Sequence, residues 1–373
     1  MKKSLFTLLL VIPLVACSKS STSNISFSSL KATPSGHFTE AQKKYLSNDD
    51  ETNTSPYNGN LSVYYPEPVH ISWESDYQGP FQVNIHKGND ISLNYFTETN
   101  SFDFYNPLFN EEYTVSIFAN DQESDSFKFI ETPSVPGPRN LKVDGVENFR
   151  DIGGWGYFDS GIYKTYIKQG MLYRSGRFNE DKAEEVKATI TKEGLYEIKN
   201  NFKIKTEIDL RRTSNNEVGG LTNKSVLGDD VNYIQLPMAF GGYNILTYIG
   251  KLNGDDYVYD NPAMIKEFFE ILADENNYPI NFHCSIGKDR TGCLAYLIEG
   301  LLCDGMTMHR DYMFTNFANA GMCKITDLTD TGRYEKTIME YNTFNDNKVF
   351  AYLNEVVGIS ETTLNTVIRL LKA

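Results

Sequence analysis

The stretch HCSIGKDRTG, residues 283–292, places a thiol and several charged side chains between two apolar runs. The run PINF before it and the run TGCLAYLIEGLL that begins at its last two residues predict a buried strand leading through a loop into a buried helix. In such a loop the backbone N–H groups of residues 285–290 can turn toward one point, which the positive end of the helix dipole also faces. Gly287 and Gly292 permit the tight curvature. The pattern therefore predicts a cradle for a dianion such as a phosphoryl group.

Cys284 lies at the base of this predicted cradle, where the inward N–H groups, the helix terminus and Arg290 all favour the thiolate over the thiol. A thiolate in that position can attack phosphorus and form a phosphocysteine intermediate. Arg290 can hold two phosphate oxygens in a bidentate fork. The hydroxyl of Thr291 can donate to the sulfur and improve it as a leaving group, while His283 is expected to order the loop by hydrogen bonding. This chemistry calls for no metal and no other cofactor.

The residues expected to bind the phosphoryl group are Ser285, Ile286, Gly287, Lys288, Arg290 and Thr291. Departure of the leaving group also needs a proton donor. Asp289, inside the cradle, is the first candidate, and Asp255 or Asp256 in the stretch LNGDDY are alternatives. A second interpretation of Asp289 is a carboxylate that orders the loop by pairing with Arg or Lys. The choice of acid stays open at this point.

The elements around the loop alternate between strand and helix patterns. Apolar runs predict strands at residues 204–210, 231–236 and 279–282, and helical periodicity predicts helices at 263–273, 291–302, 309–318 and 361–371. Such alternation is typical of an α/β fold with a central, mostly parallel sheet flanked by helices.

Residues 59–134 have a different pattern of short alternating runs separated by Gly, Pro, Asn and Asp, which predicts a small all-β, antiparallel sandwich. Trp73 on an early strand and Tyr113 near the start of a late strand give it a resemblance to immunoglobulin-like fibronectin type III domains. The Pro-rich stretch PSVPGPRN predicts a stiff linker to the α/β domain, which we place at residues 135–373.

The N-terminal residues predict export. Two lysines and an apolar run, together residues 1–16, are typical of a signal peptide, and the tetrapeptide LVAC resembles the bacterial lipobox, in which the cysteine, here Cys17, becomes lipidated. Residues 17–58 are rich in Ser, Thr, Asn and Lys, and predict a flexible tether from a membrane. The expected location is the bacterial cell envelope, with the protein lipid-anchored on the periplasmic side or at the cell surface.

The 373-residue chain has a formal net charge of −14, which argues against nucleic acid as a main partner. Apart from Cys17 the cysteines lie in the last quarter of the chain without the spacing of a disulfide framework, so we expect them to be mostly reduced. Cys293 and Cys303 are expected to be small core residues; the alternative is a redox partner for Cys284.

Several stretches together resemble one family. GVENFRDIGGW, LYRSGRFNE, IDLRRTSNNE, HCSIGKDRTG and DYMFTN are similar to motifs of bacterial tyrosine phosphatases. The resemblance implies that Cys284 is the nucleophile and Arg290 the phosphate-binding arginine, with Lys288 and Asp289 as a pair shared with lipid-phosphatase-like loops. It further implies supporting roles for the NFRD element, with Asn148, Arg150 and Asp151, and for Arg174 in LYRS.

The resemblance and the cradle lead to one functional expectation. The protein is expected to hydrolyse phosphotyrosine, with phosphoserine, phosphothreonine or phosphoinositide monoesters as further substrates. One alternative is a phosphatase for inositol phosphates or other small phosphoesters, which the same cradle could serve. A second is a surface binding protein with a vestigial phosphatase fold, which the intact set of Cys284, Arg290 and Thr291 argues against.

Overall fold

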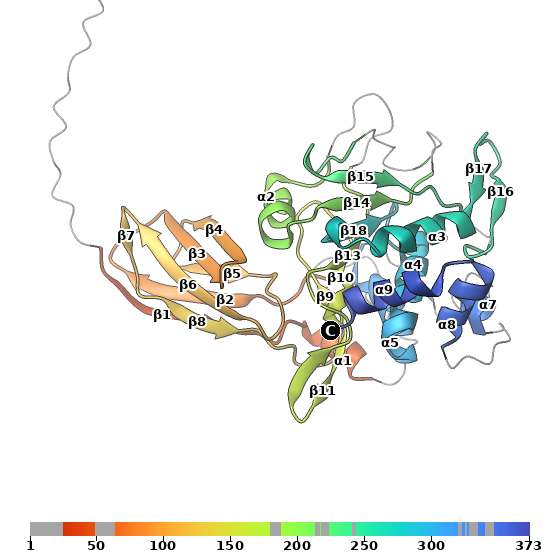
Figure 1. Ribbon diagram of the computed structural model, residues 1–373. Helices are drawn as coiled ribbons and strands as arrows, with labels where there is room; N and C mark the ends of the chain where they lie inside the picture. The colour runs from red at the N-terminus through yellow and green to blue at the C-terminus, as the bar shows by residue number, and fades with distance from the viewer. Residues whose placement is uncertain are drawn as a thin grey trace, which may run out of the picture.

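The computed structural model describes residues 25–48, 64–179, 188–212, 217, 224–240, 244–319, 323–324, 327, 335–339 and 347–373. Figure 1 shows an antiparallel β region beside a larger α/β region. The predicted signal peptide and Cys17 lie outside the described residues. No helix in the described ranges is long and apolar enough to cross a membrane.

The antiparallel region consists of two sheets, one with the strand order β1-β2-β5 and one with the order β4-β3-β6-β7, in which β8 also pairs with β6. Its strands are β1 Phe27–Thr33, β2 Val69–Ser75, β3 Phe81–Lys87, β4 Ile91–Thr97, β5 Ser101–Phe104, β6 Glu112–Ala119, β7 Gln122–Glu123 and β8 Phe127–Ile130. Side chains from both sheets form one hydrophobic cluster, because alternate residues of each strand point inward.

Two side chains of this region bear on its predicted resemblance to a fibronectin type III domain. Trp73 is buried in the cluster between the sheets. The hydroxyl oxygen of Tyr113 accepts a hydrogen bond of 3.0 Å from the backbone N–H of Leu108, a contact of the kind made by the tyrosine corner of immunoglobulin-like folds. The likeness to a fibronectin type III domain stays a prediction.

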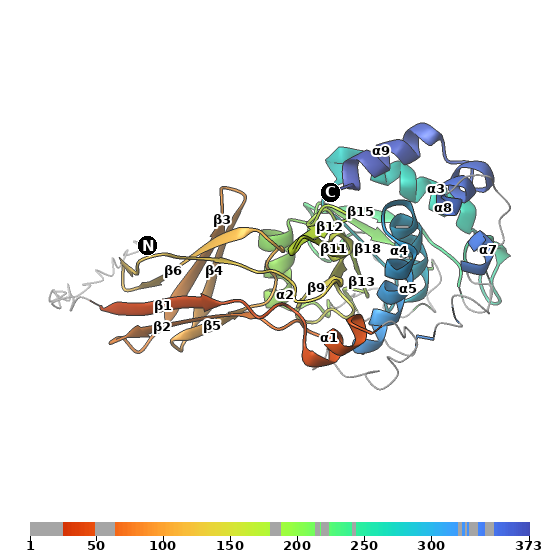
Figure 2. The ribbon, with the colours of Figure 1, turned by 90° about the horizontal axis from the view of Figure 1, so that it is seen from below.

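The prediction of a flexible tether is wrong for residues 25–48. β1 pairs with β2, and the helix α1 (Glu40–Leu46) is closed at its start by a capping box between Thr39 and Gln42. Tyr45 and Leu46 of α1 are buried in the core of the α/β region, and α1 lies beside α5 in Figure 2. The polar composition hid these elements, because backbone pairing and a few buried rings stabilise them rather than a long apolar pattern.

The α/β region is built on a six-stranded sheet with the order β15-β14-β18-β13-β10-β9. The four strands from β15 to β13 are parallel to one another. At the edge of the sheet, β10 pairs antiparallel with β13, and β9 pairs antiparallel with β10. The strands are β9 Arg139–Asn140, β10 Arg150–Asp151, β13 Leu172–Ser175, β14 Thr206–Asp209, β15 Asn232–Gln235 and β18 Ile280–His283. The predicted linker therefore ends in the first strand of this sheet.

Helices and hairpins surround the sheet. The helices are α2 Lys192–Tyr196, η4 Glu197–Phe202, α3 Asn261–Leu272, α4 Asp289–Leu302, α5 Gly305–Phe314, α7 Glu335–Met339, α8 Lys348–Ala351, η7 Tyr352–Val356 and α9 Glu361–Leu371. The short 3₁₀ turns are η3 Ile152–Gly154, η5 Glu275–Asn277 and η6 Thr315–Phe317, and the hairpins are β11 Gly156–Asp159 with β12 Ile162–Thr165 and β16 Ile249–Lys251 with β17 Val258–Asp260.

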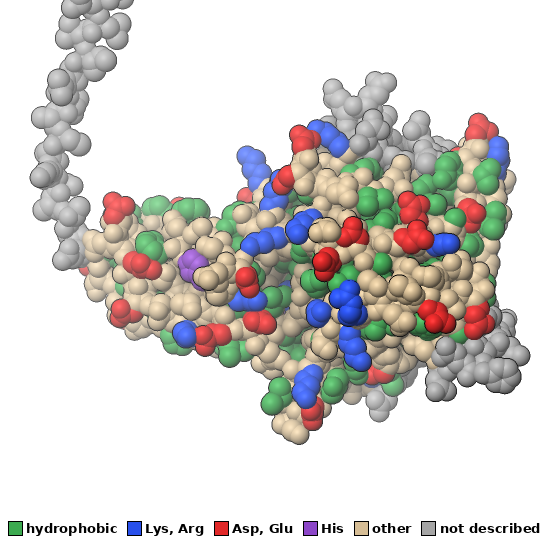
Figure 3. Space-filling model, viewed as in Figure 1, with side chains coloured by type: hydrophobic (Ala, Val, Ile, Leu, Met, Phe, Trp, Pro, Cys, Tyr) green, Lys and Arg blue, Asp and Glu red, His purple; other side chains and the backbone are tan. Residues whose placement is uncertain are grey.

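The sheet has two separate hydrophobic faces. Neighbouring residues of β13 show this: Leu172 belongs to the cluster that includes α3, α4, α5 and α9, whereas Tyr173 belongs to the cluster that includes η4. α4 packs against β13, β18, α5 and α8, and α3 packs against α9. The expected mostly parallel sheet with helices on its faces is confirmed. On the face seen in Figure 3, acidic and basic side chains are interspersed.

Candidate active site

The loop after β18 occupies the carboxyl end of a central strand, because β18 lies between β14 and β13. The chain leaves β18 at His283 and enters α4 at Asp289. Gly287 has a φ of 71°, and a Cβ atom built there would approach the backbone oxygen of Ser175 to 2.5 Å. Only glycine fits both the left-handed conformation and this close approach. The tight curvature expected from the sequence is therefore imposed by the neighbouring strand β13.

Side chains behind the loop hold its carbonyl groups. Asn148 Nδ2 donates to the oxygens of Ile286 (3.2 Å) and Gly287 (3.0 Å), and Arg174 Nη2 donates to the oxygen of Gly287 (2.7 Å). Asn148 and Arg174 are both buried. These contacts draw two successive carbonyls to the same side of the loop.

Arg177 holds the preceding carbonyl in the same way. Its backbone N–H donates to the oxygen of Ser285 (3.1 Å), and its Nη1 donates to the same oxygen (3.2 Å). The backbone N–H groups of Ser285, Ile286 and Gly287 donate to no acceptor in the described part of the chain. The N–H and C=O of one peptide unit point in opposite directions within its plane. The N–H groups of Ile286 and Gly287, which share peptide units with the held carbonyls of Ser285 and Ile286, are therefore left on the side away from the supporting residues.

Asp311 on α5 organises the supporting residues. Its carboxylate accepts from Arg150 Nε (3.0 Å), from Arg174 Nη1 and from Trp155 Nε1 (3.2 Å). Arg150 also donates to Asn148 Oδ1, so the network reaches the residue that holds the loop carbonyls. Burial acts to raise the pKa of Asp311, but the two guanidinium groups outweigh it and lower that pKa. Asp311 lies within the DYMFTN motif, which is the signal by which the sequence could have identified it.

Asp151 serves the edge of the sheet instead. Its carboxylate pairs with Arg139 Nη2 (2.5 Å) and accepts backbone N–H groups of Gly153 (2.8 Å) and Gly170 (2.7 Å). Asp151 and Arg139 are fully buried. The structure thus divides the NFRD element: Asn148 contacts the loop, Arg150 contacts Asp311, and Asp151 joins β9, η3 and the chain before β13.

Arg290 is buried and fixed by Glu217, which the sequence reasoning missed although it ends the motif IDLRRTSNNE. Arg290 Nη1 and Nη2 donate to the two carboxylate oxygens of Glu217 at 3.1 and 2.9 Å. Nη1 also donates to the oxygen of Leu210 (3.2 Å), and the ring of Phe240 lies 4.5 Å from Cζ. These contacts use one end of the guanidinium group and fix its plane.

The opposite edge of the same guanidinium is unused. Arg290 Nε is buried and has no hydrogen-bond acceptor among the described residues. A guanidinium carries five N–H bonds, so Nε–H and one Nη2–H remain side by side on this edge. Two parallel donors at that spacing match two oxygens of one phosphoryl group.

Cys284 is 2% exposed and lies close enough to Arg290 to affect it. Burial acts to lower the pKa of Arg290, but Cys284 and Glu217 outweigh it and raise that pKa above the ordinary value. The hydroxyl of Thr291 is buried and has no partner within the described ranges. The thiol of Cys284, the open edge of Arg290 and the hydroxyl of Thr291 therefore all belong to residues 284–291.

His283 makes two polar contacts at the end of β18. Its Nε2 lies 2.9 Å from Glu207 Oε1 and its Nδ1 lies 3.2 Å from the oxygen of Cys284. Next to it Asp209 pairs with Arg211 at 2.6 Å. Burial acts to raise the pKa of Asp209, but His283 and Arg211 lower it to about 2.

The candidate acids differ in their surroundings. Asp289 is buried in the first turn of α4, and the neighbouring Lys288 has its Nζ 3.7 Å from Asp327 Oδ2. Asp255 accepts from the hydroxyl of Tyr259 and from a backbone N–H; burial acts to raise its pKa, but these bonds lower it. Asp256 is fully exposed. A lowered pKa opposes proton donation by Asp255, whereas Asp289 is the candidate that belongs to the segment of Cys284 and Arg290 itself.

A groove of about 510 Å³ adjoins the loop on the side of Ser285 and Ile286. Arg177, Glu147 and Asp144 are the charged residues of its lining, and Tyr65 contributes an aromatic ring. This groove can receive the part of a substrate that carries the phosphoryl group.

Cys284, Cys293, Cys303 and Cys323 are all free thiols. Cys293 is fully buried in the core and Cys303 is half-buried against it, in keeping with core roles. No cluster of three or more His, Cys, Asp or Glu suited to a metal ion occurs in the described parts of the chain.

No curated protein matches the chain. The core catalytic domain of the PP-IP phosphatase SIW14 from S. cerevisiae, in complex with citrate, has 18% identity and a TM-score of 0.28, and covers 51% of this chain and 93% of its own. A second structure of the Siw14 catalytic core has 17% identity and a TM-score of 0.29, and covers 52% and 95%. The model of the tyrosine phosphatase family matches residues 141–373, more than half of the chain, so this protein belongs to that family of phosphoester hydrolases.

Proposed function

We propose that the protein is an exported, lipid-anchored cysteine-dependent phosphatase that hydrolyses phosphotyrosine monoesters through a phosphocysteine intermediate. The observation that supports this most is a set of donors that have no acceptor among the described residues: three backbone N–H groups, the open edge of Arg290 and the hydroxyl of Thr291, all in the segment that follows Cys284. Arg290 Nε and the Thr291 hydroxyl are buried, and buried donors without acceptors are costly; a bound phosphoryl dianion would supply the acceptors.

In the first step the thiolate of Cys284 attacks phosphorus, the S–P bond forms and the P–O bond to the leaving group breaks. Asp289 donates its proton to the departing oxygen. The backbone N–H groups and Arg290 stabilise the equatorial oxygens as charge moves onto them. In the second step Asp289 takes a proton from water, the water oxygen attacks phosphorus and the S–P bond breaks. The hydroxyl of Thr291 donates to the sulfur as it leaves.

The charges near the loop favour a monoester of phosphotyrosine over a highly phosphorylated inositol. The groove beside the loop carries two carboxylates, Glu147 and Asp144, against one guanidinium, Arg177. Lys288, which could bind a further phosphate, lies near Asp327. Several additional phosphates would meet these carboxylates, whereas an aryl group adds no charge.

The location forms part of the proposal. The apolar N-terminal run and the LVAC tetrapeptide support export to a bacterial cell envelope and lipidation of Cys17. Labelling with a radioactive fatty acid, lost in Cys17→Ala, tests the anchor; a protein that stays unlabelled contradicts it.

The catalytic test compares the release of phosphate from p-nitrophenyl phosphate by wild type, Cys284→Ser and Cys303→Ser. We expect activity that vanadate inhibits in wild type, loss of more than about 10³-fold in Cys284→Ser, and retention in the control, which changes a thiol of the same helix region. A phosphotyrosine peptide should be a better substrate than inositol hexakisphosphate. Inactive wild type, or active Cys284→Ser, contradicts the mechanism.

The role of Asp289 has its own test. Asp289→Asn should slow the hydrolysis of phenyl phosphate more than that of p-nitrophenyl phosphate. Phenolate is a poor leaving group that depends on proton donation, whereas p-nitrophenolate leaves without it. Equal losses on both substrates would assign Asp289 to ordering the loop.

A further inference from the structure

A second pocket, of about 490 Å³, lies between the β4–β5 side of the antiparallel region and the segment from α2 to η4 of the α/β region. This volume falls within the range of small-molecule sites, about 300–1,000 Å³. Its lining includes no residue of the catalytic loop and shares only Asp144 with the groove beside that loop. Most of the pocket therefore needs an explanation other than the phosphatase activity.

Hydrogen bonds between the two regions fix the walls of this pocket. The hydroxyl of Tyr95 donates to Glu197 Oε1 (2.6 Å), and the backbone N–H of Asn94 donates to the hydroxyl of Tyr196 (2.7 Å). Asn106 Nδ2 donates both to Glu197 Oε2 (2.8 Å) and to the oxygen of Lys142 (2.9 Å). The pocket is thus formed in advance of any ligand, which lowers the entropy cost of binding.

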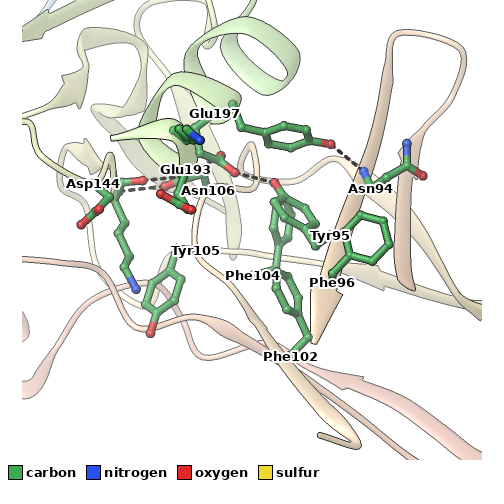
Figure 4. Close-up of a pocket in the computed structure, with 13 residues that line it drawn as sticks. Asn94, Tyr95, Phe96, Phe102, Phe104, Tyr105, Asn106, Asp144, Glu193 and Glu197 are labelled. Carbon is green, nitrogen blue, oxygen red and sulfur yellow. Dashed lines mark hydrogen bonds between the residues drawn. The ribbon is translucent and has the colours of Figure 1, made fainter. Parts of the chain in front are cut away.

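One side of the pocket is aromatic. Figure 4 shows Tyr95, Phe96 and Phe102 together, and the rings of Tyr95 and Phe102 are stacked at 4.8 Å. Phe96 is 72% exposed, the largest exposed fraction of any large apolar side chain in the described residues. The exposed ring of Phe96 is therefore accessible to a ligand that enters the pocket.

The other side carries charges of both signs. Asp144 and Glu193 lie across from the exposed ring in Figure 4, and Lys192 belongs to the same wall. None of these three forms an ion pair with another residue in the described ranges. Lys142 places its ammonium 3.8 Å from the centre of the Tyr105 ring. Acceptors and donors for hydrogen bonds are therefore available opposite an apolar surface.

These features select one class of ligand. An apolar ligand would leave the charged side chains desolvated, and an anion would meet two carboxylates. An organic cation would compete with Lys142, which already occupies the face of Tyr105. A neutral saccharide has C–H groups that pack on a ring face and peripheral hydroxyls that bond to carboxylates and ammonium groups.

We propose that the pocket between the two regions binds a neutral saccharide, with Phe96 as the stacking platform and Glu193 and Asp144 as acceptors for its hydroxyls. The proposal concerns binding alone and does not depend on the substrate or mechanism of the phosphatase. Such a site would bring the enzyme to a glycan-bearing surface.

The test is isothermal titration calorimetry of the full chain with maltotriose, chitotriose and mannotriose. We expect at least one trisaccharide to bind wild type. Phe96→Ala should weaken that binding about tenfold or more, because a ring contact is lost, and Glu193→Gln should weaken it to a smaller extent. Phe127→Ala, which removes an exposed ring on β8 outside the pocket, is the matched control and should bind as wild type does.

Thermal unfolding of each variant checks that the fold is retained. The proposal is overturned if none of the three trisaccharides binds, or if Phe96→Ala binds as tightly as wild type. Binding of tetramethylammonium chloride or of a tryptophan-containing peptide in their place, lost in Phe96→Ala, would also overturn it by assigning the pocket to another class of ligand.

Discussion

The two sides of the catalytic loop contrast in how their hydrogen-bonding groups are used. Behind the loop, Asn148, Arg174 and Arg177 donate to successive carbonyls, and Asp311 pairs with Arg174 and with Arg150. In front of it, the backbone donors and one edge of Arg290 have no acceptor in the described part of the chain. The hydrogen bonds behind the loop stabilise it and compensate for the donors in front that have no acceptor. The residues that stabilise the loop therefore lie on one side of its backbone, and the groups proposed to bind phosphate lie on the other.

Removing the charge of Asp311 should have the largest effect. Asp311→Asn leaves Arg150 and Arg174 buried without their counter-ion, so we expect the free energy of unfolding to fall by about 3–5 kcal/mol. Urea unfolding at pH 7 measures it, followed by tryptophan fluorescence in a Trp73→Phe background, in which Trp155 beside Asp311 is the remaining tryptophan.

Glu299 offers the matched control for that variant. It is buried beside Asp311, and burial and the charge of Asp311 raise its pKa well above the ordinary value. The raised pKa favours the uncharged carboxyl, so Glu299→Gln removes less charge than Asp311→Asn does and should cost less than about 1 kcal/mol. If Asp311→Asn also lowered the free energy of unfolding by less than about 1 kcal/mol, the ion pairs behind the loop would not be what stabilises it.

On the front side, Arg290→Lys keeps a positive charge but loses the paired donors. We expect kcat/KM for p-nitrophenyl phosphate to fall about 10²–10³-fold, because a point charge cannot replace a bidentate contact in the transition state. Glu217→Gln, which loosens Arg290 without removing its open edge, should lose less. An equal loss in both variants would show that position rather than donor geometry decides the rate.

The stability of the residues behind the loop should depend on pH through Asp209. The folded-state pKa of Asp209 is lowered to about 2 from its ordinary value of 3.8, so its carboxylate contributes stability that is fully present above pH 3.8. That contribution, about 2 kcal/mol, is lost as the pH falls through 2. Urea unfolding between pH 5 and pH 2 should show this added slope in wild type and not in Asp209→Asn; parallel profiles would contradict it.

The smallest effect concerns Asn148. Asn148→Ala removes two hydrogen bonds to loop carbonyls and leaves alanine at a φ of 57°, which asparagine tolerates better, so we expect a loss of about 1–2 kcal/mol. The value of kcat/KM should also fall. Asn354→Ala removes an amide-to-carbonyl bond far from the loop and should leave kcat/KM unchanged. Unchanged activity in Asn148→Ala would mean that the loop keeps its shape without this support.

The elements with strong local signals could be predicted from the sequence. The predicted helix at residues 361–371 is α9, whose amphipathic pattern follows an N-cap at Ser360. The strand before Cys284 and the helix after it also match, because apolar runs and glycines specify them within a few residues. β1 and α1 were missed, since their stability comes from pairing with β2 and from packing on distant helices.

The sequence by itself determined the cradle, its thiol and its arginine, because these residues lie within one turn of chain and their chemistry depends on local backbone geometry. Only the tertiary structure decided which edge of Arg290 stays open, since Glu217 lies 73 residues away. The same holds for Asp311, which is 137 residues from Arg174, and for the pocket formed where two regions meet. Long-range partners follow from how strands and helices pack, and no local pattern of residue types encodes that packing.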